Sequence, residues 1–494
     1  MTGLWLAVCI GVIGPFHVRT DGIDDAERDG LTPKTAFASV GYACDRVRDV
    51  REQDDSVEPA VIRLATGQFA VEAPILLPTQ TELLGVGFHG KEFSRLVASS
   101  TWPLQESNHE ADLLPETMLQ IERGSRDVKL YGVQFESAPE HLIGGAIHVR
   151  DGDGIEIHTC RFRDFRWFGI TALFSQNLNV HGCGFHHCSQ QKKGHRLGQI
   201  YTSWIKDSRI GHCRLVPKPN GGGYGYKGGG HENVEIHDNL IEPCYFAIES
   251  PHESEYGLHI HHNELHGAIS VPKGGPGADP QKRGQQWAVE IDYNVMTDSY
   301  AIEGPRNHLW VHHNHIHVNK PNGRIYAQFG GENPGPIRFD HNVIENVDRS
   351  LLWVRNGYAA DITFEHNTVL AADAKDRTGD LFSVYDGKII DGWKVRKNIL
   401  IAAWNRPRRL FRTERGVPEK IECVDNWLVN IVDPPSDNHI GTYPSLIRGT
   451  SDKPFPFFAF DAESIPNLPP RFAEGRVGAI AIEATMEPVG IRRQ

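Results

Sequence analysis

Short runs of alternating apolar and polar residues recur through the middle of the chain, and each run ends in a turn. The segments Val234-Glu-Ile-His-Asp-Asn239, Leu258-His-Ile-His-His-Asn263 and Val289-Glu-Ile-Asp-Tyr-Asn294 carry one pattern. Their apolar residues occupy alternate positions and therefore point to one side of a β-strand. The pattern predicts half-buried strands that return at regular intervals.

A second repeat lies between the copies of the first. It reads Ala247-Ile-Glu-Ser-Pro251, Ala268-Ile-Ser-Val-Pro272 and Ala301-Ile-Glu-Gly-Pro305. Proline at the same place in each copy fixes the same turn. Two interleaved repeats of short strands predict a coil in which successive turns of the chain stack on one another.

One residue position closes each copy of the first pattern. Intervals of 20 to 31 residues separate its occupants, which are Cys160, Cys183, Cys213, Asn239, Asn263, Asn294, Asn314, Asn342, Asn367, Asn398 and Asn426. A stacked amide can bond the amides above and below it, and Asn tolerates the left-handed backbone of tight turns. We therefore expect a ladder of eight asparagines beside a parallel sheet.

The start of the chain follows a different pattern. A turn-rich segment covers residues 20–40, a helix is predicted at about 39–51, and strand-like alternation covers 60–69 and 75–87. The predicted fold is all-β: a single-domain right-handed parallel β-helix with a short helix in its N-terminal cap and an extended C-terminal tail. The predicted segments are a signal at 1–15, a cap with first coils at 16–126, repeats at 127–430 and a tail at 431–494.

The Asn ladder after a Val-x-Ile-x-x-Asn strand resembles the pectate-lyase-like superfamily of right-handed β-helix proteins. The opening Thr-Ala-Phe-Ala-Ser segment at 35–39 resembles the start of many secreted members. The resemblance implies that a substrate groove runs along the sheet that precedes the ladder strand. The chain lacks the Lys-Ser and Arg-His-Gly pair of the chondroitinase-like and alginate-lyase-like enzymes and the Asp-Asp and Gly-His-Gly motifs of polygalacturonase-like hydrolases. The segment at 246–253 has a weak similarity to the Tyr-Gly-x-Asp-Pro-His signature of mannuronan epimerases.

Composition narrows the functional classes. Formal net charge is −12, from 51 Lys and Arg against 63 Asp and Glu, which argues against a general nucleic-acid binder. The eight Cys show neither a disulfide framework nor a Cys-x-x-Cys metal motif.

The apolar run Leu4–Ile13 is too short to span a membrane and fits a secretory signal, although no basic residue precedes it and no small-x-small cleavage site follows. A buried first strand of the cap is the alternative. No later segment predicts a membrane span. The chain is therefore expected to be secreted or periplasmic.

Variation inside the second repeat points to chemistry. If the repeats are in register, Lys227, Glu249, Ser270 and Glu303 occupy one outward column. Lys227, Glu249 and Glu303 are the candidate catalytic residues. An ordinary solvated ion pair between Lys227 and Glu249 is the alternative, and it would contribute under about 1 kcal/mol.

A second column, three positions further on, is basic. It contains His252, Lys273 and Arg306, which could bind an anionic group of a substrate. Continuation of the first column gives aromatic and charged residues suited to sugar rings. These further substrate-binding candidates are Tyr201, Tyr326, Trp353 and Arg355.

Metal binding has a weaker basis in the sequence. Glu249 and Glu303 could hold Ca²⁺, which prefers oxygen ligands, and no other cofactor is expected. The histidines before the ladder residues, such as His262, His313, His341 and His366, form a straight column. A zinc site needs ligands that converge, so these imidazoles are interpreted as structural or surface groups.

The leading hypothesis is a secreted lyase that cleaves an acidic, uronate-containing polysaccharide by β-elimination. Lys227 would be the base, with His252, Lys273 and Arg306 as the anion clamp. An inverting glycoside hydrolase that uses Glu249 and Glu303 is the alternative. A non-catalytic carbohydrate-binding β-helix is the third hypothesis.

Overall fold

The coiled part of the computed structural model begins at a strand near the N-terminus and is covered there by the one helix of the described residues. The structure describes residues 13–54, 58–87, 92–104, 116–190, 198–218, 223–250, 255–271, 287–297, 302–303, 308–318, 325–333, 336–347, 350–371, 380–385, 390–402, 407–413, 421–432, 434–440, 446–448 and 458–460. Contacts between residues divide the chain into two compact units, Met1–Glu249 and Ser250–Gln494.

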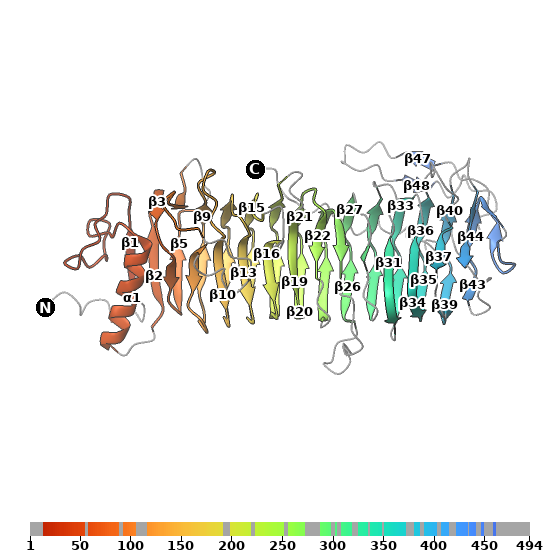
Figure 1. The fold of residues 1–494 in the computed structure, drawn as a ribbon, viewed down its shortest axis with the longest axis horizontal. Helices are drawn as coiled ribbons and strands as arrows, with labels where there is room; N and C mark the ends of the chain where they lie inside the picture. The colour runs from red at the N-terminus through yellow and green to blue at the C-terminus, as the bar shows by residue number, and fades with distance from the viewer. Residues whose placement is uncertain are drawn as a thin grey trace. The chain divides into compact units, whose positions relative to one another are not determined.

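The first unit consists of three parallel sheets, A, B and C, and each coil contributes one strand to each sheet. Strands of sheet A precede the ladder position. They are β1 (Ile13–Val18), β2 (Ala60–Leu64), β5 (Thr81–Leu84), β8 (Lys129–Tyr131), β11 (Glu156–His158), β14 (Asn179–His181), β17 (Lys206–Gly211) and β20 (Glu232–His237) (Figure 1).

Sheet B follows the ladder position, and sheet C follows sheet B. Sheet B of this unit contains β3 (Gly67–Val71), β6 (Ser94–Ala98), β9 (Val133–Glu136), β12 (Arg161–Arg163), β15 (Gly184–His186), β18 (Arg214–Val216) and β21 (Leu240–Ile241). Sheet C contains β4 (Ile75–Leu77), β7 (Thr117–Ile121), β10 (Gly145–Arg150), β13 (Phe168–Leu173), β16 (Gly198–Ser203), β19 (Tyr224–Gly229) and β22 (Phe246–Glu249).

The core of the first unit lies inside the coil. Phe162 stacks on Phe135 and Phe185 of the neighbouring coils, with ring centroids 5.3 and 4.7 Å apart. Burial of each such side chain contributes about 1.5–3 kcal/mol. Because the parallel register repeats residue for residue, like side chains stack in columns, and outward residues form columns of their own.

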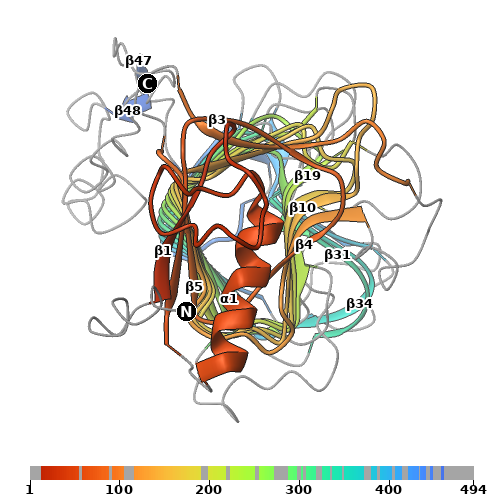
Figure 2. The same ribbon diagram turned by 90° about the vertical axis from the view of Figure 1, so that its left-hand side faces the viewer.

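Helix α1 (Val40–Asp54) lies across the end of the first coil (Figure 2). Ser39 accepts a hydrogen bond from the Tyr42 N–H and starts the helix as its N-cap. Ala43 and Val47, which belong to α1, are fully buried. Arg51 donates to the backbone carbonyls of Thr79 and Gln80, at 2.6 and 3.0 Å, so α1 also satisfies carbonyls at the end of the coil.

The second unit repeats the three-sheet arrangement. Its sheet A contains β23 (Tyr256–His261), β26 (Val289–Asp292), β29 (Leu309–His312), β32 (Ile337–Asp340), β35 (Ile362–Glu365), β39 (Trp393–Arg396) and β43 (Ile421–Val424). Sheet B contains β24 (Glu264–His266), β27 (Val295–Thr297), β30 (His315–His317), β33 (Val343–Val347), β36 (Thr368–Ala371), β40 (Ile399–Ile401), β44 (Trp427–Val429) and β46 (His439–Ile440).

Sheet C of the second unit is formed by β25 (Ala268–Ser270), β28 (Ile302–Glu303), β31 (Tyr326–Asn333), β34 (Leu352–Ala360), β37 (Phe382–Tyr385) and β42 (Phe411–Thr413), and β38 (Ile390–Asp391) also pairs with β34. Two short pairs complete the described strands. They are the parallel pair β41 (Arg408–Arg409) with β45 (Ile431–Val432) and the antiparallel pair β47 (Leu446–Arg448) with β48 (Phe458–Phe460).

The asparagine ladder of the sequence is present in the second unit and is longer than predicted. The Asn294 side chain donates to the amide oxygen of Asn314 at 3.0 Å, and the same contact repeats along the column to Asn426 and Asn438. In the first unit the Cys213 N–H donates to the Asn239 amide oxygen at 2.9 Å. The predicted parallel β-helix is therefore confirmed in both units.

The observed boundaries of the helix and of the first strands differ from the predicted ones. The helix predicted at 39–51 is α1, three residues longer at its C-terminal end. The single strands predicted at 60–69 and 75–87 are each divided in two, because the chain turns a corner of the coil in each. Gln80, with a φ of 48°, marks one such corner. Of the predicted signal segment, the described residues 13–15 belong to β1, and the signal itself stays a prediction.

Candidate functional site

The outer face of sheet C in the first unit carries three of the predicted site residues. In the strand register Tyr201 of β16 lies beside Lys227 of β19, and Lys227 lies beside Glu249 of β22. The side chains of Lys227 and Glu249 are 22% and 15% exposed. This part of the predicted column is in register, and its side chains point away from the coil interior.

Lys227 and Glu249 form an ion pair. The Lys227 Nζ lies 3.2 Å from the Glu249 Oε2 and 5.0 Å from the centroid of the Tyr224 ring. The pair therefore presents one proton donor and one proton acceptor on the same face.

The column continues toward the N-terminus beyond Tyr201, through Thr171 and His148, which the repeats did not indicate. Tyr201 packs against the buried pair Trp167 and Phe168. Thr171 lies beside Tyr201, and His148 lies beside Thr171. Burial, together with the Arg150 guanidinium, lowers the pKa of His148 from 6.5 to about 4, so this imidazole is neutral at neutral pH.

The corresponding column of the second unit corrects one prediction. Ser270 pairs with Glu303 as expected, but Ala327 and not Tyr326 lies beside Glu303. Tyr326 pairs with Ile302 and so belongs to the neighbouring position of the strand. A shift of one residue transfers a side chain to the other face of a sheet. Trp353 is in the predicted column, because it pairs with Ala327.

Several candidates lie outside the described part of the structure. Glu303, Tyr326 and Arg355 belong to described strands, but their side chains are outside that part. His252, Lys273 and Arg306 lie outside the described residues. The basic column and the calcium site at Glu249 and Glu303 therefore stay predictions.

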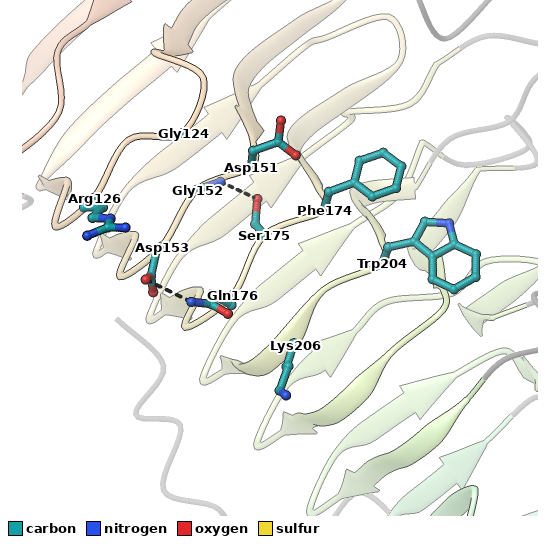
Figure 3. A pocket seen from close by; sticks show the side chains of 10 residues that line it. All are labelled: Gly124, Arg126, Asp151, Gly152, Asp153, Phe174, Ser175, Gln176, Trp204 and Lys206. Carbon is teal, nitrogen blue, oxygen red and sulfur yellow. Dashed lines mark hydrogen bonds between the residues drawn. The ribbon is translucent and has the colours of Figure 1, made fainter. Parts of the chain in front are cut away.

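A groove lies where the strands of sheet C turn toward sheet A in the first unit (Figure 3). It has a volume of about 390 Å³, and residues of the turns after β7, β10, β13 and β16 form its lining. Figure 3 shows two rows of side chains with Gly152 and Ser175 between them. One row is aromatic and the other is polar.

The aromatic row begins with Asp151 and continues with Phe174 and Trp204, which are 51% and 42% exposed. Both have the left-handed backbone conformation, with φ of 53° and 55°, directly after the last residue of their strands. Gly230 follows in the next coil, where a Cβ would lie 2.7 Å from the Trp204 ring. Glycine at 230 therefore provides the space that the indole occupies.

The polar row is built from Arg126, Asp153, Gln176 and Lys206, which pair in succession between neighbouring coils. Asp153 accepts hydrogen bonds from the side chains of Asn177 and Gln176, at 2.7 and 2.9 Å, and these bonds lower its pKa. Two cations and one carboxylate thus lie along one side of the groove, and two exposed rings lie along the other. Exposed rings beside hydrogen-bonding groups suit the flat faces and hydroxyls of sugars.

Sequence reasoning missed this groove because its residues lie outside both repeats. The sequence carries only a weak signal for the groove. Leu173-Phe174-Ser-Gln-Asn177 and Ser203-Trp204-Ile-Lys-Asp207 each place an aromatic residue directly after a strand and before a polar turn. Alignment of these two turns with Arg150-Asp-Gly-Asp-Gly154 would have shown the two rows.

The coil, its ladder and its three parallel sheets define the class of the protein, a right-handed parallel β-helix. The family described as right handed beta helix region matches residues 120–271. No curated protein sequence matches the chain. Among the described helical residues, no segment has the length and apolar character needed to cross a membrane.

Solved structures with the same fold are distant in sequence. A mutant tailspike protein of E. coli bacteriophage HK620 in complex with pentasaccharide is 10% identical, with a TM-score of 0.51 over 75% of this chain and 74% of that one. PfbA, a surface adhesin of Streptococcus pneumoniae, is 11% identical, with a TM-score of 0.39 over 80% of this chain and 89% of that one. DFA-IIIase from Arthrobacter chlorophenolicus A6 is 12% identical, with a TM-score of 0.37 over 88% and 100%.

Proposed function

We propose that the protein binds an acidic polysaccharide along the outer face of sheet C of the first unit and cleaves it by β-elimination. One observation carries the proposal: the ion pair of Lys227 and Glu249 lies in register with Tyr201 of β16, and the turn after β16 lines the groove. A saccharide-binding protein of the same fold, the tailspike in complex with pentasaccharide, makes the ligand class plausible.

β-Elimination needs three functions at one sugar. A cation must offset the uronate carboxylate, a base must remove the C5 proton, and an acid must protonate the departing oxygen. The Lys227 ammonium is paired with Glu249, so Lys227 acts as base only when bound substrate separates the pair and the proton is lost. His252, Lys273 and Arg306 are proposed as the anion clamp.

The proposal is tested with purified protein and a panel of uronate-containing and sulfated polysaccharides, with and without a calcium chelator. A lyase forms unsaturated products that absorb near 235 nm, and Lys227→Ala should remove this absorbance. Lys129→Ala is the matched control, because Lys129 is an ion-paired lysine on sheet A of the same unit. Equal rates for Lys227→Ala and the wild type would contradict the proposal.

The same experiment separates the two alternatives. New reducing ends without absorbance near 235 nm would indicate a glycoside hydrolase, and Glu249→Gln would then be the decisive variant. Retention on immobilised polysaccharide with neither product would indicate a carbohydrate-binding protein. Loss of activity on chelation would support the calcium site at Glu249 and Glu303.

A further inference from the structure

Four side chains that suit a transition metal converge on the outer face of sheet A in the second unit. Glu290 and Asp292 are two residues apart on β26 (labelled in Figure 1), and they point to the same face. His259 comes from the preceding coil, on β23, and His312 from the following coil, on β29. Two imidazoles from neighbouring coils therefore flank two carboxylates on the middle one.

The strand register makes these groups converge diagonally. His259 pairs with Glu290, yet its Nε2 lies 2.7 Å from Oδ1 of Asp292. His312 pairs with Asp292, yet its Nε2 lies 2.9 Å from Oε1 of Glu290 and 3.9 Å from Oδ2 of Asp292. Ligand atoms of His259, Glu290 and Asp292 all lie within 4.8 Å of one another.

These separations fit one metal ion. Bonds of about 2.0–2.1 Å in a tetrahedral site place neighbouring ligand atoms about 3.3 Å apart. The observed distances of 2.7, 2.9 and 3.9 Å lie on both sides of that value. His259, Glu290 and Asp292 already form one group of ligand atoms, and a rotation of the His312 side chain toward Asp292 would complete a tetrahedral set.

Burial and neighbouring contacts fix the inner half of the cluster. The side chains of Asp292 and His312 are 9% and 8% exposed, whereas those of His259 and Glu290 are 33% and 29% exposed. The Trp310 ring stacks on the imidazole of His312, with centroids 3.8 Å apart. The Nδ1 of His312 lies 2.9 Å from the Nδ1 of His313, so a hydrogen bond there directs Nε2 toward the carboxylates.

We propose that His259, Glu290, Asp292 and His312 bind a single Zn²⁺ ion, which links three successive coils. Two nitrogen and two oxygen donors match Zn²⁺ and disfavour Ca²⁺, which takes oxygen ligands. The straight histidine column described from the sequence does not provide such a site. The new site arises because ligands come from two neighbouring columns of the sheet.

The test uses full-length protein freed of metal by a chelator and titrated with Zn²⁺ in a calorimeter. His259→Gln and Glu290→Gln change the more exposed ligands and should each weaken Zn²⁺ binding by about tenfold or more. His212→Gln is the control, because His212 belongs to a three-residue cluster with His237 and Asp238 in the first unit. That variant should keep the wild-type affinity for the proposed site.

Two further measurements make the outcome decisive. Co²⁺ in place of Zn²⁺ should give the visible absorption of a tetrahedral nitrogen and oxygen site, and this absorption should be lost in Glu290→Gln. Zn²⁺ should raise the melting temperature of the wild type and not of His259→Gln. Circular dichroism of the metal-free variants checks that they fold. Wild-type Zn²⁺ affinity in both variants, or a protein that binds no Zn²⁺, would overturn the proposal.

Discussion

Phe174 and Trp204 expose large aromatic rings at positions where the backbone is left-handed. Their φ values of 53° and 55° match that of Asp151 in the preceding coil, because this corner position is left-handed in successive coils; bulky residues are uncommon at such a position. Each ring lies directly after a strand of sheet C and protrudes from the corner of the coil beside the polar row (Figure 3). We infer that this backbone conformation aims the rings at a ligand.

Trp204→Ala should weaken binding of the polysaccharide substrate by about tenfold, because one stacking surface for a sugar ring is lost. Tryptophan and alanine must both adopt the left-handed backbone at position 204, so the free energy of unfolding should change little. Affinity electrophoresis in polysaccharide-containing gels provides the measurement. Tyr131→Ala removes an equally exposed ring (45%) from sheet A and is the control. Equal retardation of Trp204→Ala and the wild type would exclude this groove as a sugar site.

His148 should make the protein less stable as the pH falls from about 6.5 to about 4. Its pKa is about 4 in the folded protein and 6.5 without burial, so in this interval only the unfolded chain takes up the proton. The loss is at most about 3 kcal/mol. His17, His181, His186 and His313 also have lowered pKa values and act in the same direction.

Urea unfolding of the wild type and His148→Gln at several pH values between 4 and 7 checks this prediction. The variant should show a smaller decrease in the free energy of unfolding across the interval, whatever its stability at pH 7. Gln68→Ala, which changes an exposed side chain that does not titrate, should leave the decrease as in the wild type. Parallel curves for His148→Gln and the wild type would disprove the assignment.

At the scale of elements, the asparagine ladder fixes how successive coils meet. Asn314 is fully buried, accepts bonds from the backbone and side chain of Asn294, and donates to Asn342 and to the carbonyls of Ile291 and His312. Every side-chain hydrogen-bonding atom of this amide is therefore used. Removal of the Asn314 side chain would leave its buried partners without these hydrogen bonds.

Asn314→Ala should lower the free energy of unfolding by about 3 kcal/mol, because buried donors and acceptors on both neighbouring coils lose their partners. The midpoint of urea-induced unfolding reports the change. Asn179→Ala is the matched control, since Asn179 is half-buried on β14 and its amide makes one weak contact with His158 at 3.5 Å. A loss below about 1 kcal/mol for Asn314→Ala would show that the ladder is not needed for stability.

The ladder could be predicted from the sequence because its spacing survives loops of different lengths. Register within sheet C was harder to predict. After Glu303 no further copy of the Ala-Ile-Glu repeat marks the next strand of sheet C, so the predicted column included Tyr326, although Ala327 lies beside Glu303. Tyr201, Lys227 and Glu249 were placed correctly because the strands that hold them end in recognisable turns.

The proposed zinc site could not be predicted for a different reason. It depends on contacts between neighbouring columns of side chains, whereas the repeats reveal contacts within one column. His259 reaches Asp292 and His312 reaches Glu290 diagonally across the sheet. Such geometry follows from side-chain rotamers and strand twist, which a linear pattern does not contain.

At the scale of the molecule, the described cysteines form no disulfide bonds. Six of the seven are buried, and burial raises the pKa of Cys44 and Cys423 to about 12. Cys160, Cys183 and Cys213 occupy ladder positions in the first unit, where their sulfur atoms lie close to backbone carbonyls. The described cysteines therefore contribute no disulfide cross-link to the coils.

Labelling of the native protein with iodoacetamide should modify Cys244 before the other six described cysteines, because Cys244 alone among them is partly exposed and thiolates are the reactive form. Mass spectrometry of peptides gives the order of labelling. All seven should react after denaturation without a reductant. Rapid native labelling of Cys188 would contradict the burial described for the first unit.

Helix α1 also has a consequence for solubility. The first coil of a parallel solenoid presents unpaired backbone groups, and such an edge can recruit strands from other chains. By covering this end, α1 blocks that route to self-association. A chain that begins after residue 54 would therefore be expected to polymerise into fibres through its uncovered end, even though its repeats remain intact.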